Sequence, residues 1–104
     1  MKEAFEIIKE YKEIGETEDL VFDDVKIEHF TPELKHEIEQ LSELVYLSLN
    51  NCQLKSLNHF PQIKNLMTLE LNDNQFPIRE LLHLSGLTNL KSLDLDGLKI
   101  EKVE

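Results

Sequence analysis

Carboxylate side chains recur in this chain beside short segments in which leucine alternates with polar residues. Side chains alternate between the two faces of a β-strand, so the residues between the leucines share one exposed face. Clustered carboxylates attract cationic groups, above all lysine- and arginine-rich protein segments. The seven acids at these positions are Asp19, Asp23, Asp24, Glu70, Asp73, Asp94 and Asp96.

The other positions of this expected face are polar, aromatic or small, and none is Lys or Arg. They are Val21, Tyr46, Ser48, Asn50, Asn51, Thr68, Asn72 and Ser92. The chain as a whole has 11 bases and 21 acids, so the face is more acidic than the composition requires. The residues expected to contact a partner are Asp19, Asp23, Asp24, Tyr46, Asn50, Glu70, Asn72, Asp73, Asp94 and Asp96. The alternative interpretation is an acidic surface that serves only solubility.

Patterns of catalytic or metal-binding residues are absent from the sequence. His36 begins "HEIEQ", which lacks the second histidine of a zinc-protease helix, and "NDN" at 72–74 lacks the glycine and glutamate of a calcium loop. There is no G-x-S-x-G, P-loop or G-x-G-x-x-G segment. We therefore expect no enzyme activity, no catalytic residues, no metal site and no cofactor.

The elements that position the acidic residues are repeated. "LVYLSLNNCQLKSL" from Leu44 is followed by "LMTLELNDNQF" from Leu66 and "LKSLDLDGLKI" from Leu90, so the copies start 22 and 24 residues apart. Each copy fits L-x-x-L-x-L-x-x-(N/C/L)-x-(L/F/I), the core of a leucine-rich repeat, whose period is about 20–29 residues. Cys52 and Asn74 hold the position at which a buried side chain bonds backbone groups of adjacent turns, and Cys52 is expected to be unreactive.

The sequence predicts an α/β fold: a leucine-rich-repeat solenoid with a short parallel concave sheet. Residues 1–15 are expected to cap it as an amphipathic helix over 2–14, and Thr31 followed by Pro32 predicts the start of a second helix. Apolar residues spaced by three after the second and third strands predict 3₁₀ turns on the convex side. They are Leu57, Phe60, Ile63 and Leu66, then Ile78, Leu81, Leu84, Leu87 and Leu90. Residues 1–104 are expected to form one domain, with repeats starting near 17, 44, 66 and 90.

The charge and composition of the chain limit the classes of partner that it can bind. The formal net charge is −10, which repels nucleic acid and anionic membranes, and no apolar run reaches the length of a membrane span. The first residues do not form a secretory signal, and the single cysteine has no partner for an internal disulfide. These features favour an intracellular protein.

The last strand is expected to present an open, apolar edge, because no repeat or cap follows it. The residues left there are Leu93, Leu95, Leu98, Ile100 and Val103. An uncovered edge is an association hazard. Either the chain is part of a longer one or a partner covers the edge, and the simplest partner is a second copy in a homodimer.

The segment "ELVYLSLNNCQLKSLNHFPQIKNLMTLELNDNQF" (43–76) and "NLKSLDL" (89–95) resemble the repeats of the acidic leucine-rich nuclear phosphoprotein family. That resemblance implies nuclear and cytoplasmic localisation, histone binding, a chaperone role and inhibition of protein phosphatase 2A. The family usually carries one more repeat, a C-terminal cap and a long acidic tail, which this sequence lacks. Similar repeats also occur in the spliceosomal A-prime protein and in phosphatase regulators, so an RNA-processing scaffold and a phosphatase-regulating subunit are the alternatives.

Overall fold

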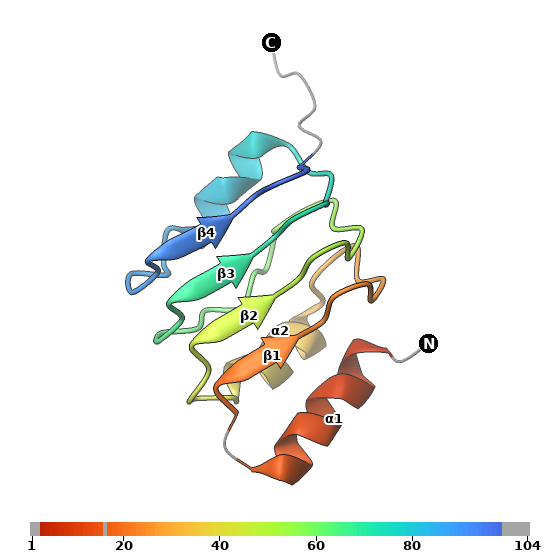
Figure 1. Ribbon diagram of the computed structural model, residues 1–104, viewed down its shortest axis with the longest axis vertical. Coiled ribbons are helices and arrows are strands. Elements are labelled where there is room, and N and C mark those ends of the chain that lie inside the picture. The colour runs from red at the N-terminus through yellow and green to blue at the C-terminus, as the bar shows by residue number, and fades with distance from the viewer. Residues whose placement is uncertain (1–2, 16, 99–104) are drawn as a thin grey trace.

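The computed structural model describes residues 3–15 and 17–98 and shows a small α/β fold with one four-stranded parallel sheet (Figure 1). The strands lie in sequence order, β1-β2-β3-β4, and three short helices accompany them. Their bounds are α1 Ala4–Ile14, β1 Asp19–Val21, α2 Pro32–Glu39, β2 Tyr46–Ser48, β3 Thr68–Glu70, the 3₁₀ helix η1 Ile78–Leu84 and β4 Ser92–Asp94.

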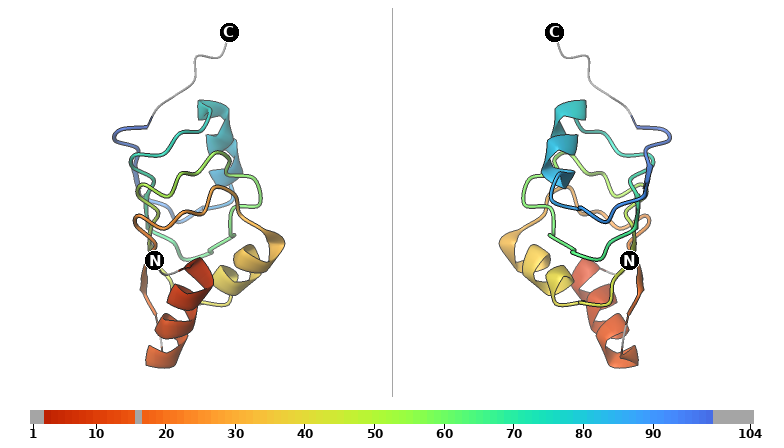
Figure 2. Two further views of the ribbon diagram at one scale, coloured as in Figure 1. Left: turned by 90° about the vertical axis from the view of Figure 1, so that its right-hand side faces the viewer. Right: turned by 90° about the vertical axis from the view of Figure 1, so that its left-hand side faces the viewer.

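The sheet is built in a single register that places the repeated leucines side by side. Leu20 pairs with Leu47, Leu47 with Leu69, and Leu69 with Leu93. One face of the sheet is turned toward α2 and η1, and the other lies open (Figure 2). Because each strand is only three residues long, its central leucine alone points from the strand into the core.

Leucines directly after the strands complete the core. Leu49 and Leu71 are both fully buried, as the repeat pattern predicts. Fully burying a leucine side chain is worth about 1.5–3 kcal/mol. The repeated leucines are therefore the main source of cohesion between successive strands.

The connections behind the sheet agree with the sequence-based prediction in part and differ from it in two places. The hydroxyl Oγ1 of Thr31 accepts a hydrogen bond from the Leu34 amide at 3.1 Å, which caps α2 as expected. The 3₁₀ helix expected after the third strand is present as η1, but Ile78, its first residue, is 49% exposed rather than part of the core. Over 57–66, which the structure describes in full and where the sequence also predicts 3₁₀ turns, there are two isolated turns of this type but no 3₁₀ helix. The Phe60 amide donates to the Leu57 carbonyl at 3.0 Å, and the Leu66 amide donates to the Ile63 carbonyl at 3.2 Å.

Asn74 and Cys52 join neighbouring turns inside the fold, as the sequence predicts. Asn74 Nδ2 donates to the carbonyls of Leu49 (2.9 Å) and Leu71 (3.0 Å), and its Oδ1 accepts from the Cys52 amide at 3.0 Å. The Cys52 thiol donates to the Phe22 carbonyl at 3.1 Å. Burial raises the pKa of this thiol to about 12, so it stays protonated and unreactive at neutral pH.

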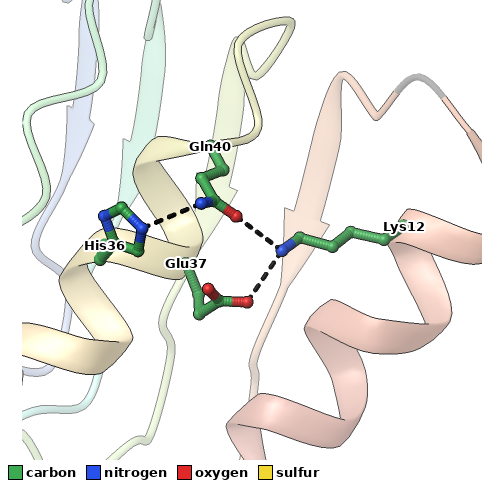
Figure 3. Close-up of polar contacts among 4 residues, drawn as sticks. All are labelled: Lys12, His36, Glu37 and Gln40. Carbon is green, nitrogen blue, oxygen red and sulfur yellow. Dashed lines mark hydrogen bonds and ion pairs between the residues drawn. The ribbon is translucent and has the colours of Figure 1, made fainter.

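Helix α1 lies beside β1, at the opposite end of the molecule from β4 (Figure 1). Its buried residues are Ala4 and Ile8, and its last turn is tied to α2 by polar contacts (Figure 3). The Lys12 ammonium donates to Glu37 Oε1 at 2.8 Å and to Gln40 Oε1 at 2.9 Å. The sequence predicted this helix over 2–14. Residues 4–14 are helical, and Lys2 lies outside the described residues.

The β4 end of the core is incompletely covered. Leu93 is 39% exposed, whereas its counterpart Leu69 is fully buried, and Leu95 and Leu98 are half-buried. Ile100 and Val103, which the sequence assigns to the same edge, lie outside the described residues. Among the described residues, no helix is long and apolar enough to cross a membrane.

Candidate partner-binding face

The open side of the sheet gathers the acidic residues identified in the sequence. We call the seven carboxylates on it and on the loops that directly follow the strands the acidic face: Asp19, Asp23, Asp24, Glu70, Asp73, Asp94 and Asp96. Register brings Asp19, Tyr46, Thr68 and Ser92 into one row, and Glu70 beside Asp94 in the next. Adjacent strands lie about 4.8 Å apart, so neighbouring carboxylates share one electrostatic field.

Asp23 is held by hydrogen bonds from the neighbouring turn. Its Oδ1 accepts from the Ser48 hydroxyl at 2.5 Å and from the Asn50 amide at 3.0 Å. Ser48 is only 1% exposed, so the carboxylate satisfies a hydroxyl that water barely reaches. Asp23 is therefore a structural acceptor that joins β1 to β2.

Glu70 plays a similar part across β2 and β3. It accepts from the Tyr46 hydroxyl at 2.6 Å and from Asn50 Nδ2 at 2.9 Å. These hydrogen bonds favour the charged carboxylate, and they lower the pKa of Glu70. The same contact raises the pKa of Tyr46, because the phenol is held as a donor. Tyr46 is thus oriented across the face instead of projecting freely from it.

Asn50 and Asn72 connect successive strand ends in a pattern that the sequence analysis did not anticipate. Asn50 Oδ1 accepts from the Asn72 amide at 2.8 Å, and Asn72 Oδ1 accepts from the Asp96 amide at 2.7 Å. Asp23 Oδ1 accepts from the Asn50 amide in the same way. In all three cases a side-chain oxygen accepts a hydrogen bond from the backbone N–H of the equivalent residue after the next strand. We call Asp23, Asn50, Asn72 and Asp96 the acceptor row. Its signal in the sequence is an Asp or Asn at the same offset after every strand.

Backbone conformation accounts for two more of the acids. Asp24, Asn51, Asp73 and Gly97 occupy equivalent positions and have φ angles of 67°, 54°, 60° and 69°. Asp, Asn and Gly are the residues that adopt this left-handed conformation most readily. Asp24 also accepts from Asn51 Nδ2 at 2.8 Å. Part of the acidity of the face thus follows from turn geometry.

Four carboxylates remain available to a partner: Asp19, Asp73, Asp94 and Asp96. Within the part of the chain that the structure describes, none of these carboxylates accepts a hydrogen bond or forms an ion pair. Asp19, Asp73 and Asp96 are exposed, and Asp94 is half-buried. We call these four the free acids.

An open groove of about 950 Å³ lies where the strands end, beside the acceptor row. Asp24, Asn51 and Asp73 contribute to its lining, and Lys55 is the only basic residue among the described residues that line it. The Lys55 ammonium pairs with Glu28 at 2.9 Å and lowers the pKa of that carboxyl through this contact. Lys55 lies in the loop beyond β2, so the alternation of side chains along the strands did not predict a base beside the face.

Comparisons with known proteins give partial similarities. No family model matches the chain, and no solved structure matches it significantly. The chain is 31% identical over 80 residues to a histone 2A variant, designated Y, of Tetrahymena thermophila, an alignment that covers 77% of this chain and 21% of that protein. It is 37% identical over 68 residues to an acidic leucine-rich nuclear phosphoprotein 32-related protein of Arabidopsis thaliana, covering 64% of this chain and 15% of that protein.

The chain thus spans about a fifth or less of the length of these two relatives. The second similarity agrees with the family resemblance already visible in the repeats, over about two thirds of the chain. The chain is accordingly similar, over that part, to an acidic leucine-rich nuclear phosphoprotein-related protein.

Proposed function

We propose that residues 1–104 form one non-enzymatic leucine-rich-repeat domain of solenoid type, with α1 as its cap. In this proposal the acidic face docks basic segments of nuclear proteins, histones in particular. The repeated motif and the parallel register of equivalent leucines support the repeat assignment. The names of the two similar proteins, a histone and a nuclear phosphoprotein, support a nuclear, histone-related role.

The observation that carries the proposal is the set of free acids. Asp73, Asp94 and Asp96 lie at or beside the last two strands, and Asp19 lies on β1. Carboxylates with no internal partner keep their full capacity to accept from lysine and arginine. The net charge of −10 adds a long-range attraction that steers basic proteins toward the domain.

Asp23 and Glu70 have a different role in this proposal. Their oxygens already accept hydrogen bonds within the fold, so they contribute charge to the face while fixing the positions of Ser48, Asn50 and Tyr46. Neutralising them would change the stability of the face together with its charge. A test of docking must therefore leave both residues in place.

The test is histone binding by a variant in which the four free acids are changed to asparagine. We expect binding of core histones, measured by fluorescence anisotropy at about 100 mM salt, to weaken at least about tenfold. The interaction should also weaken steeply as salt rises, because screening acts first on exposed charges. Circular dichroism and urea unfolding should show an intact fold, since none of these carboxylates has an internal partner.

A matched control removes four exposed acids elsewhere. Changing Glu6, Glu13, Glu33 and Glu43 to glutamine alters the net charge by the same amount, away from the acidic face. We expect this control to bind histones within about twofold of the parent. Equal binding by both variants would show that only total charge matters, and undiminished binding by the free-acid variant would disprove docking at this face.

A further inference from the structure

Within residues 3–15 and 17–98, the outer edge of β4 presents backbone donors without acceptors. In the preceding strand segments the Leu49 amide donates to Glu70 O at 2.9 Å and the Leu71 amide donates to Asp94 O at 2.8 Å. The equivalent residue beside β4 is Leu95, and Gly97 is likewise equivalent to Asp73, whose amide donates to Asp96 O at 2.9 Å. Among the described residues, neither Leu95 nor Gly97 has an acceptor for its amide. Such an edge is a template for an additional strand.

The same end of the molecule exposes apolar side chains. Leu93 is 39% exposed, while its counterparts Leu47 and Leu69 are completely buried. Helix η1, which lies at this end behind β4 (Figure 2), exposes 49% of Ile78 and 76% of Leu82. An added strand with apolar residues on its core-facing side would bury surface that is now in contact with water.

The negative charge at this edge determines which residues an added strand should carry on its exposed face. Asp94 and Asp96 are free acids on β4 and directly after it, and Asp73 lies beside Gly97 at the same place. The exposed-face residues of an added strand would lie directly beside Asp94 and Asp96. Lysine or arginine at those positions would pair with them, whereas acidic residues would be repelled.

The acceptor row indicates the direction of the added strand. Asp23, Asn50 and Asn72 each accept the backbone N–H of the equivalent residue of the next parallel strand. Asp96 is the fourth member, and within the described residues its side chain has no such donor. A parallel fifth strand in register would supply one.

We propose that the β4 edge binds an extended segment of a basic protein, which adds to the sheet as a fifth, parallel strand. The segment alternates apolar residues, facing Leu93 and η1, with lysine or arginine, facing Asp94 and Asp96. A second copy of this chain fits less well, because two-fold pairing of β4 edges brings the Asp94 and Asp96 carboxylates of both copies together. The edge shares Asp94 and Asp96 with the acidic face, but strand addition requires backbone hydrogen bonds that docking on the face does not, so the two proposals can fail separately.

The probe is a ten-residue peptide of alternating isoleucine and lysine. In parallel pairing the exposed-face residues direct their amides toward the preceding strand, as Ser92 N does toward Met67 O at 3.0 Å. N-methylation of the lysine residues therefore removes the hydrogen bonds to β4, whereas N-methylation of the isoleucines leaves them intact. We expect lysine-methylated peptide to bind at least about tenfold more weakly than isoleucine-methylated peptide, as measured by fluorescence anisotropy.

Amide hydrogen exchange locates the contact. The amides of Leu95 and Gly97 should exchange rapidly in the free protein and at least about tenfold more slowly with the peptide bound. Asp94→Asn with Asp96→Asn should weaken peptide binding, and the charge-matched control pair Glu33→Gln with Glu43→Gln, away from the acidic face, should not. Equal binding of the two methylated peptides would overturn the proposal, as would protection of Leu95 and Gly97 in the free protein. If sedimentation shows that this protection accompanies dimer formation, the occupant is a second copy and the proposal is wrong.

Discussion

Replacing Asp23 with alanine should lower the free energy of unfolding far more than is usual for a residue on the solvent-facing side of a sheet. The substitution leaves the Ser48 hydroxyl and the Asn50 amide without the acceptor that now lies at 2.5 Å and 3.0 Å. An unsatisfied buried donor costs about 1–3 kcal/mol. Ser48 is almost fully buried, so the cost of leaving its hydroxyl unsatisfied lies near the middle of that range. Asn50 is half-buried, so the cost for its amide lies near the lower end. The expected decrease in the free energy of unfolding is about 3 kcal/mol.

Urea unfolding followed by circular dichroism measures this decrease. With a slope of about 1.5 kcal/mol per molar urea, the midpoint should fall by about 2 M. Asp23→Asn retains one side-chain oxygen and should lose about half as much or less. Asp19→Ala, which removes an acid with no internal hydrogen bond, should change the stability by less than about 0.5 kcal/mol. If Asp23→Ala and Asp19→Ala unfold at the same urea concentration, the acceptor row does not stabilise the sheet.

Three further predictions concern the core, the pH dependence and the thiol. Leu71→Ala should cost about 2–5 kcal/mol in urea unfolding, because the side chain is fully buried; a loss below about 1 kcal/mol would contradict the register. Hydrogen bonds from Tyr46 and Asn50 hold the pKa of Glu70 below its ordinary value, so its stabilising contribution is present at neutral pH and is lost as the pH falls through the folded-state pKa. The stability difference between the parent and Glu70→Gln should therefore shrink between pH 7 and about pH 3 in urea titrations, and a constant difference would refute this cause. The Cys52 thiol should react with a disulfide reagent only as fast as the protein unfolds, since burial raises its pKa to about 12; rapid labelling of the native protein would show that the thiol is accessible.

The periodic pattern of apolar residues in the sequence predicted which side chains form the core. Leu49 and Leu71 are buried because alternation along a strand assigns every second side chain to the core. Asn74 and Cys52 have the expected contacts because their position in the repeat leaves backbone groups to be satisfied inside the fold. The spacing by three also predicted η1, although Ile78 at its start is exposed, but the same spacing over the fully described segment 57–66 gives isolated turns and no 3₁₀ helix.

Periodicity did not predict which polar residues on the open face are engaged. Asp23 and Asp19 are both acids at exposed-face positions, and hydropathy alone does not distinguish them. Asp23 has its role because the strand register places the Ser48 hydroxyl and the Asn50 amide within hydrogen-bonding distance, and the register depends on the three-dimensional fold. The acceptor row was visible in principle, as Asp or Asn at a fixed offset after each strand, but that pattern gains meaning only once the pairing is known.

The acceptor row also determines how this protein can change length. Asn50 Oδ1 accepts a hydrogen bond from the Asn72 amide, and Asn72 Oδ1 accepts one from the Asp96 amide. Each segment that runs from one of these residues to the residue before the next one therefore begins with a side-chain acceptor, and the amide that donates to it is the first of the following segment. A tandem copy of segment 50–71 would carry its own strand, core leucines and acceptor, so the acceptor row would continue across both junctions. Insertions of half such a segment would misalign the row. Growth and shortening in whole segments are therefore the changes of length that this architecture tolerates.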